Sequence, residues 1–275
     1  MINNVVDPIQ VLGYFGAFLV GLILGLIGSG GSILSLPILV YIFGVNPVLA
    51  TGYSLFIVGA TSLIGSIKNL KDNLINYDTT LFFSVSAIIS VYITQKYILG
   101  IIPDIIYSSN IMVLTKEKMI MLLFSILMLI AGIFMVKKSP KTIVKIKNIK
   151  TIGPNKLIVL VEGALTGFIT GLVGAGGGFI IVPILVILAN LRMKHAIATS
   201  LAIISLKSLI GFIGAVEFWG TAIEWRFLLS FTMISIVGIF VGQYFNHKVA
   251  SDKLKDIFGI FVISIAIIIL IKTII

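Results

Sequence analysis

The sequence predicts an all-α polytopic membrane protein made of two inverted repeats of about five helical segments each. The first two segments of each repeat are expected to form a Gly-rich broken helix or hairpin. Three observations support this fold class. Hydrophobic residues make up 59% of the 275 residues and charged residues only 11%, which is far too little charge to cover a soluble surface. A glycine-rich stretch occurs twice, and basic residues gather in a few loops.

The internal repeat is the most specific of these observations. Residues 21–40 return without a gap as 167–186, and both copies read Gly-x-x-x-Gly-Leu-[Ile/Val]-Gly-x-Gly-Gly followed by Pro-Ile-Leu. The same offset also aligns Ala50, Ser54, Leu55, Ser62 and Gly65 with Ala196, Ser200, Leu201, Ser208 and Gly211. A match of this length indicates duplication. In a hydrophobic chain, corresponding segments interrupted by Gly and Pro are typical of secondary transporters that bind their substrate at the interruptions.

Five apolar segments are predicted in each half, and the second of each set is short. They lie at 10–28, 32–43, 48–67, 79–99 and 119–136, and then at 157–174, 178–189, 196–216, 226–246 and 257–275. About 20 residues are needed to cross a hydrocarbon core, so neither short segment can span it as a straight helix. Pro37 and Pro183 lie inside the short segments, where each removes a backbone donor. We therefore expect each first pair to turn back or break at the glycine run.

The lysines predict the orientation in the membrane. Seven lysines and no acid lie from Lys137 to Lys156, which predicts a Lys-rich cytoplasmic linker at 137–156. The linker separates a first transmembrane repeat at 1–136 from a second at 157–275. Counting outward from it places the other clear basic clusters inside and both termini outside. Each half then makes an odd number of crossings, so the two repeats are inverted.

The clustered glycines and their neighbouring serines are candidate substrate-binding residues. Unwound backbone at membrane depth must be buried in protein or face a polar cavity, and free N–H groups at a helix N-terminus favour an anion. The candidates are Gly28, Ser29, Gly30, Gly31 and Ser32, with Gly174, Gly176, Gly177 and Gly178. Alternatively, the glycines only let helices cross closely. We favour that interpretation for the glycines spaced four apart, which are Gly21, Gly25, Gly167 and Gly171.

These motifs resemble the TauE/SafE family of sulfite and organosulfur anion exporters. The resemblance rests on the paired glycine motif, the following Pro-Ile-Leu and Ala-x-x-x-Ser-Leu in both halves, and it covers nearly the whole chain. It implies a multi-pass carrier in the plasma (inner) membrane that moves small sulfur-containing anions such as sulfite, sulfoacetate or thiosulfate. The chain departs from the pattern at Ser29 and Ser32, and at Lys207, where an uncharged polar residue is expected.

Lys207 is the most informative single residue. It lies 11 positions into the segment 196–216, about 16 Å deep and near the bilayer centre. A lysine there costs at least about 2.5 kcal/mol on insertion scales, so it should face a partner or a cavity. Three roles are open: contact with a substrate anion, a structural ion pair with Glu162, or a neutral lysine that carries protons. Thr61 occupies the equivalent place in the first half and can donate to an anion without the charge.

The repeat aligns Ser54 with Ser200 and Ser62 with Ser208. Ser54 and Ser62 lie about two turns apart and share one face of their helix, and Ser200 and Ser208 do the same. That face either lines a translocation path or forms interhelical and i−4 hydrogen bonds. We expect no nucleic-acid partner, because the basic excess is explained by topology.

We also expect no cofactor and no metal. The chain has no cysteine, and His195 and His247 are far apart. We do not expect an enzyme, because no base and nucleophile lie at helical spacing within the predicted spans. The expected partners are a small anion and the lipid bilayer, with proton or ion coupling left open. The alternative function is a non-transporting membrane assembly or scaffold subunit whose glycines only pack helices.

Overall fold

The fold is known from a computed structural model that describes residues 8–28, 31–108, 113–136, 156–187, 191–246 and 251–274. The first half contains α1 (Pro8–Ile27), α2 (Ser32–Pro37), the π-helix η1 (Ile38–Ile42), α3 (Pro47–Lys71), α4 (Tyr77–Ile93), the π-helix η2 (Thr94–Ile98), α5 (Leu99–Ile101), the strands β1 (Ile105–Ser108) and β2 (Val113–Thr115), and α6 (Lys116–Val136). The second half contains α7 (Lys156–Val173), α8 (Gly178–Ile187), α9 (Met193–Trp219), the 3-10 helix η3 (Gly220–Ala222), α10 (Trp225–Asn246) and α11 (Ser251–Ile274).

The prediction of an all-α polytopic membrane protein is confirmed. Six helices of the described part are long and apolar enough to cross a membrane, and three shorter apolar helices accompany them. Helices occur at all ten predicted segments. The antiparallel hairpin of β1 and β2 before α6 was not predicted. It pairs two short runs rich in β-branched residues, which favour strands.

The second segment of each half is short, as expected. In the first half, α2 has six residues, ends at Pro37 and continues as the π-helix η1. Proline lacks the amide hydrogen that an α-helix would use there, and the wider i→i+5 bonding begins directly after it. In the second half, α8 has ten residues and contains Pro183. Both segments are therefore too short to cross the hydrocarbon core alone.

Helix pairs from the two halves pack side by side. The closest pairs are α1 with α10, α4 with α7, α3 with α9, and α6 with α11. The repeat aligns α1 with α7 and α4 with α10. The pair α1 with α10 is therefore equivalent to the pair α7 with α4. The other two pairs, α3 with α9 and α6 with α11, then each join a helix to its own counterpart.

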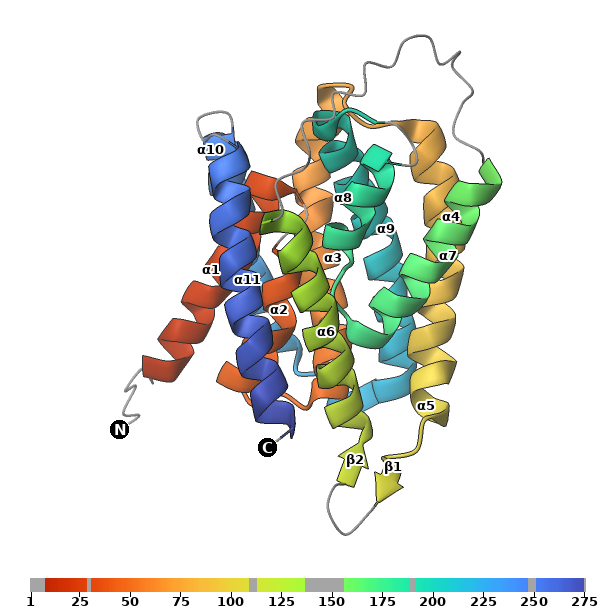
Figure 1. The fold of residues 1–275 in the computed structure, drawn as a ribbon, viewed down its shortest axis with the longest axis vertical. Helices are drawn as coiled ribbons and strands as arrows, with labels where there is room; N and C mark the ends of the chain where they lie inside the picture. Colours follow the sequence, from red (N-terminus) through yellow and green to blue (C-terminus); the bar gives the residue numbers. More distant parts are fainter. Residues whose placement is uncertain are drawn as a thin grey trace.

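Close contacts give the direction of these pairs. Gly52 lies against Ala215 and Gly59 against Leu209, so α3 and α9 run antiparallel. Gly132 lies against Ile263 and Gly259 against Met135, so α6 and α11 also run antiparallel. In Figure 1, α1 begins and α11 ends at one end of the bundle, called here the termini end. The other end, where α6 ends and α7 begins, is called the linker end.

The four-spaced glycines lie where helices cross closely. A Cβ on Gly21 would lie 1.8 Å from the carbonyl oxygen of Ser235, and one on Gly25 would lie 2.5 Å from that of Ile239. In the second half, Gly167 meets the backbone of α4 at Ala87 in the same way. No larger residue fits at these contacts, which agrees with the packing role expected for this set of glycines.

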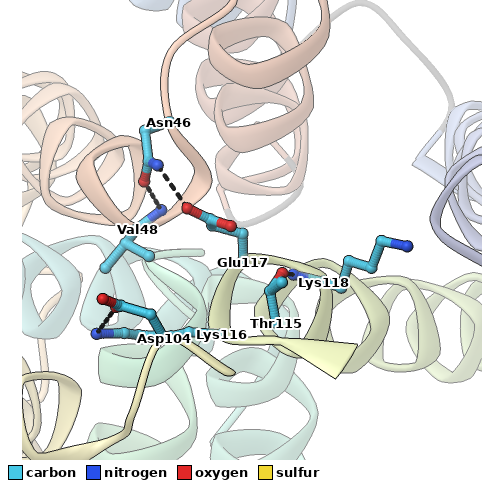
Figure 2. A network of polar contacts seen from close by, with 7 residues as sticks. All are labelled: Asn46, Val48, Asp104, Thr115, Lys116, Glu117 and Lys118. Atoms are coloured by element: carbon cyan, nitrogen blue, oxygen red, sulfur yellow. Dashed lines mark hydrogen bonds and ion pairs between the residues drawn. The ribbon is translucent and has the colours of Figure 1, made fainter. Parts of the chain in front are cut away.

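A polar network fixes the start of α3 at the termini end (Figure 2). Asn46 caps α3 by accepting a hydrogen bond from the Val48 amide at 2.9 Å, and its side-chain amide donates to Glu117 of α6 at 2.8 Å. Lys116 forms an ion pair with Asp104 beside it. An asparagine cap stabilises a helix start by about 1 kcal/mol. The network joins the beginnings of α3 and α6.

Candidate functional site

Each glycine run forms a turn that most residues cannot adopt. Gly28 at the end of α1 has φ 76°, and Gly174, Gly176 and Gly177 after α7 have φ 67°, 60° and 75°. Positive φ is open to glycine with little strain, so these four positions depend on glycine for their backbone alone. Gly31 differs, because its φ of −62° suits any residue. Glycine is needed there for space, since a Cβ would lie 2.1 Å from the carbonyl oxygen of Val20 on α1. Ser29 and Gly30 lie outside the described residues.

The two glycine runs meet in the middle of the bundle. A Cβ on Gly176 would lie 3.1 Å from the Cβ of Ser32 and 2.6 Å from Val58 of α3. Ser32 begins α2 and is completely buried. Gly178 begins α8 directly after the second run. The structure thus places the starts of both short helices together, next to α3.

Lys207 of α9 lies at this meeting point. Its side chain is completely buried, and its ammonium donates a hydrogen bond of 2.6 Å to the hydroxyl of Thr170 on α7. The Nζ atom lies 3.3 Å from the position that a Cβ on Gly177 would occupy. An ammonium carries three donors. One hydroxyl uses one of them, so two donors at a glycine turn are left for another acceptor.

The structure shows no acidic partner for Lys207 in the part of the chain that it describes. The ion pairs there join Lys96 to Glu217 and Lys116 to Asp104. Glu162 lies eight residues before Thr170 on the same helix, a separation of about 12 Å along the axis. The structural ion pair between Lys207 and Glu162 is therefore not formed in this conformation. A buried ammonium without a counter-charge is costly, and an anion would relieve that cost.

Three buried hydroxyls on the central helices α3 and α9 have no partner among the described residues. Thr61, Ser62 and Ser208 are completely buried, and within the described ranges their hydroxyls have no hydrogen-bond partner. Thr61 aligns with Lys207 across the repeat, and Ser62 aligns with Ser208. Buried polar atoms are nearly always hydrogen-bonded in native proteins. Three such exceptions on two helices that pack together make these hydroxyls candidates for contact with a ligand.

Ser54 and Ser200 are aligned in sequence but differ in their contacts. The hydroxyl of Ser54 forms a short hydrogen bond with that of Ser35 on α2, and Ser35 also bonds the carbonyl of Ser32. Ser54 is therefore tied to the first glycine turn. Ser200 donates to the carbonyl of Ile197 on its own helix at 2.8 Å. Of the two sequence-based alternatives, Ser200 follows the helix back-bonding one in this conformation.

Two residues that the sequence analysis missed hold the second glycine turn in place. Thr170 is the hydrogen-bond partner of Lys207. Gln95, on the π-helix η2, is 1% exposed and donates to the carbonyl of Gly171 at 2.7 Å and to the hydroxyl of Thr51 at 3.3 Å. Its Oε1 atom has no partner in the described part of the chain. An amide inside an apolar segment was the available signal, because polar side chains at membrane depth often mark functional sites.

Each end of the bundle has a hollow. At the linker end, Lys68, Asn69 and Asp72 of the α3 end face Lys194 of α9 and Gln243 of α10 across one hollow. At the termini end, Tyr53 of α3 and Glu224 line another. The glycine turns and Lys207 lie between the two ends along α3 and α9. This arrangement, with a buried polar centre between two hollows, is that of a membrane transporter.

Comparison with known proteins defines the family. Residues 14–269 match the profile of the sulfite exporter TauE/SafE family, and the chain belongs to that family. A probable membrane transporter protein of Xylella fastidiosa (strain 9a5c) is 28% identical over 252 residues, which cover 90% of both chains. One of Methanocaldococcus jannaschii is 30% identical over 203 residues, covering 71% of this chain and 68% of the relative. No solved structure matches significantly.

Proposed function

We propose that this membrane transporter is a secondary carrier of a small anion, and that the anion contains sulfur, as sulfite, thiosulfate and sulfoacetate do. The observation that carries the proposal is Lys207, a completely buried ammonium whose one described partner is a neutral hydroxyl. Hydrogen bonds from an ammonium to an anionic oxygen are about twice as strong as neutral ones. The site therefore favours a ligand with negative charge.

The groups around Lys207 are mostly donors. We assign to the same site the unpartnered hydroxyls of Thr61, Ser62 and Ser208, and the start of α8 at Gly178, which directly follows the glycine next to the Lys207 ammonium. The positive end of a helix dipole adds to the field of the ammonium. An oxyanion with three or more acceptor oxygens can use several of these donors together. The candidates of the first glycine run, from Gly28 to Ser32, belong to the same proposed site. Ser54 is linked to this run through Ser35.

The proposed mechanism is alternating access of two inverted repeats. The first repeat would extend over 1–136, the Lys-rich linker over 137–156 and the second repeat over 157–275. The antiparallel packing of α3 on α9 and of α6 on α11 supports this division, since equivalent helices related by an axis in the membrane plane must run in opposite directions. The lysines of the linker support a cytoplasmic linker and external termini in the inner membrane.

Anion-dependent thermal stabilisation tests this proposal. The purified protein should unfold several degrees higher in millimolar sulfite, thiosulfate or sulfoacetate than in chloride at equal ionic strength, because a ligand at 100 times its Kd stabilises by about 2.7 kcal/mol. The shift should disappear in Lys207→Met. A scaffold subunit whose glycines only pack helices should show no difference among these anions, and that result would contradict the proposal.

A further inference from the structure

The hollow at the linker end carries two lysines with no acidic partner in the part of the chain that the structure describes. Lys68 lies near the end of α3 and Lys194 near the start of α9, and both line the hollow. The other polar groups that face it are the amides of Asn69 and Gln243 and the carboxylate of Asp72. Neither lysine forms an ion pair with Asp72. The lining therefore has a net positive charge.

An apolar layer closes the inner side of this hollow. Ile197 and Leu201 of α9 line its inner wall. The side chain of Ile197 packs against Gly28 so closely that a Cβ there would lie 2.1 Å away. Leu201 forms a buried cluster with Leu24 of α1 and Ile239 of α10. These side chains are apolar, so the layer opposes the passage of a hydrated anion.

The same order of groups occurs along both central helices. On α3, Lys68 at the hollow is followed inward by Gly65, which contacts Ile239 of the apolar layer, and then by Thr61. On α9, Lys194 is followed by Leu201 of the layer and then by Lys207. Lys68 and Thr61 are about 10 Å apart along the axis. From the linker end inward, both helices therefore carry first a lysine of the basic hollow, then the apolar layer, and then Thr61 or Lys207.

We propose that this hollow is an anion antechamber, a second binding site in which Lys68 and Lys194 hold the transported oxyanion before Ile197 and Leu201 move aside. This inference rests on the proposed function and adds to it a site and a gate. A basic hollow with low-dielectric walls concentrates anions and speeds their arrival. The apolar layer then keeps the anion from the Lys207 site until the repeats move.

The equivalent contact near the other end is built differently. Thr51 aligns with Ile197, and it packs against Gly174 as Ile197 packs against Gly28. Thr51 also accepts a hydrogen bond from Gln95, which bonds Gly171 as well. The contact toward the termini end is thus polar and hydrogen-bonded, whereas the contact toward the linker end is apolar. This difference assigns the basic antechamber and its apolar gate to the linker end.

Cysteine labelling tests the antechamber, and the chain has no native cysteine to interfere. Asn69→Cys places a thiol in the hollow, and its reaction rates with anionic sulfonatoethyl and cationic trimethylammonioethyl methanethiosulfonate are compared. The ratio of the two rates cancels the reactivity of the thiol itself. We expect the anionic reagent to be favoured at low salt. The ratio should fall about fivefold for each lysine removed by Lys68→Gln or Lys194→Gln, for a charge roughly 8 Å away in water.

The matched control is Lys118→Gln, which removes the same charge at the termini end, where Lys118 follows the hairpin (Figure 2). It should leave the ratio unchanged. An unchanged ratio in both Lys68→Gln and Lys194→Gln, or an equal fall in Lys118→Gln, would overturn the antechamber.

The accessible side is calibrated with two further cysteine variants. Asn148→Cys marks the linker, and Ser108→Cys marks the exposed hairpin strand β1. In intact cells only Ser108→Cys should react with an impermeant reagent, because the linker is expected to be cytoplasmic. Asn69→Cys should react with the impermeant reagent only in membrane preparations in which Asn148→Cys also reacts, because both are expected on the cytoplasmic side. Reaction from the side of Ser108 would place the hollow on the wrong face and contradict the proposal.

A second reporter tests the gate. Thr61→Cys lies beyond the apolar layer, so it should react slowly from the linker side, and Leu201→Ala should make it react severalfold faster. The control Leu206→Ala changes a side chain on the same helix that is 44% exposed, and it should have no effect. An equal rate in Leu201→Ala and the parent would exclude a gate at this layer. Labelling needs no transport, so failure of the carrier proposal would appear separately, as absent anion stabilisation.

Discussion

Replacing Lys207 by methionine should weaken anion affinity about tenfold or more and abolish uptake at micromolar substrate. The methionine keeps a long apolar stem but removes the charge, and a hydrogen bond to a charged group contributes about 1.5–3 kcal/mol. The side chain is completely buried and touches only Thr170 among polar groups of the described residues. Isothermal titration with sulfite measures the loss. Unchanged affinity in a folded Lys207→Met protein would show that the ammonium does not contact the anion.

The double variant Lys207→Met with Glu162→Gln separates substrate contact from an ion pair. If Lys207 only neutralised Glu162 in another conformation, the single variant would leave an uncompensated carboxylate, and the double variant would recover stability and uptake. We expect no recovery, because the two residues are not paired. If Lys207 instead carried protons, Lys207→Met would bind anions normally and lose the pH dependence of uptake. Either of those outcomes would contradict a direct contact.

Gly177→Ala should abolish uptake while the protein still inserts and folds. A Cβ at this position would lie 2.3 Å from Thr170 Cγ2 and 3.3 Å from the Lys207 ammonium, so it would displace both members of the hydrogen bond. The residue also has φ 75°, and a non-glycine residue in that region costs about 1–2 kcal/mol. Uptake and the unfolding temperature are measured together.

The matched control for this variant is Gly44→Ala. Gly44 has a similar φ of 67°, but nothing lies within 4 Å of the position of its Cβ. The control should therefore carry the same backbone strain without the clash, lose comparable stability and keep its uptake. Equal loss of uptake in both variants would mean that backbone strain, and not the site at Lys207, explains the effect.

The repeat and the hydropathy were enough to predict the main features of the fold. The helix lengths followed because a membrane fixes the length of a crossing segment, and the short segments followed from the length of the apolar runs 32–43 and 178–189. The hairpin of β1 and β2 was not predicted, since its pairing is local and lies outside the apolar segments. The partners of each helix were also not predictable, because a nearly uniformly apolar helix has little periodicity to mark its contact face.

The candidate site shows the same limit at the level of single residues. Lys207 could be selected because a charged group at membrane depth is costly wherever it points, and Thr61 because the repeat aligns it with Lys207. Thr170 and Gln95 could not be assigned, because their roles come from contacts between helices far apart in the sequence. Ser54 and Ser200 show that aligned residues can differ, since one contacts α2 and the other bonds its own helix.

The most direct test of a sulfur-anion carrier is uptake into proteoliposomes that contain the purified protein. We predict saturable uptake of at least one of sulfite, thiosulfate and sulfoacetate, faster than that of chloride and absent from liposomes reconstituted with Lys207→Met. If none of these anions enters faster through the wild-type protein than through the variant, the buried ammonium is not part of an anion pathway and the proposed function is wrong.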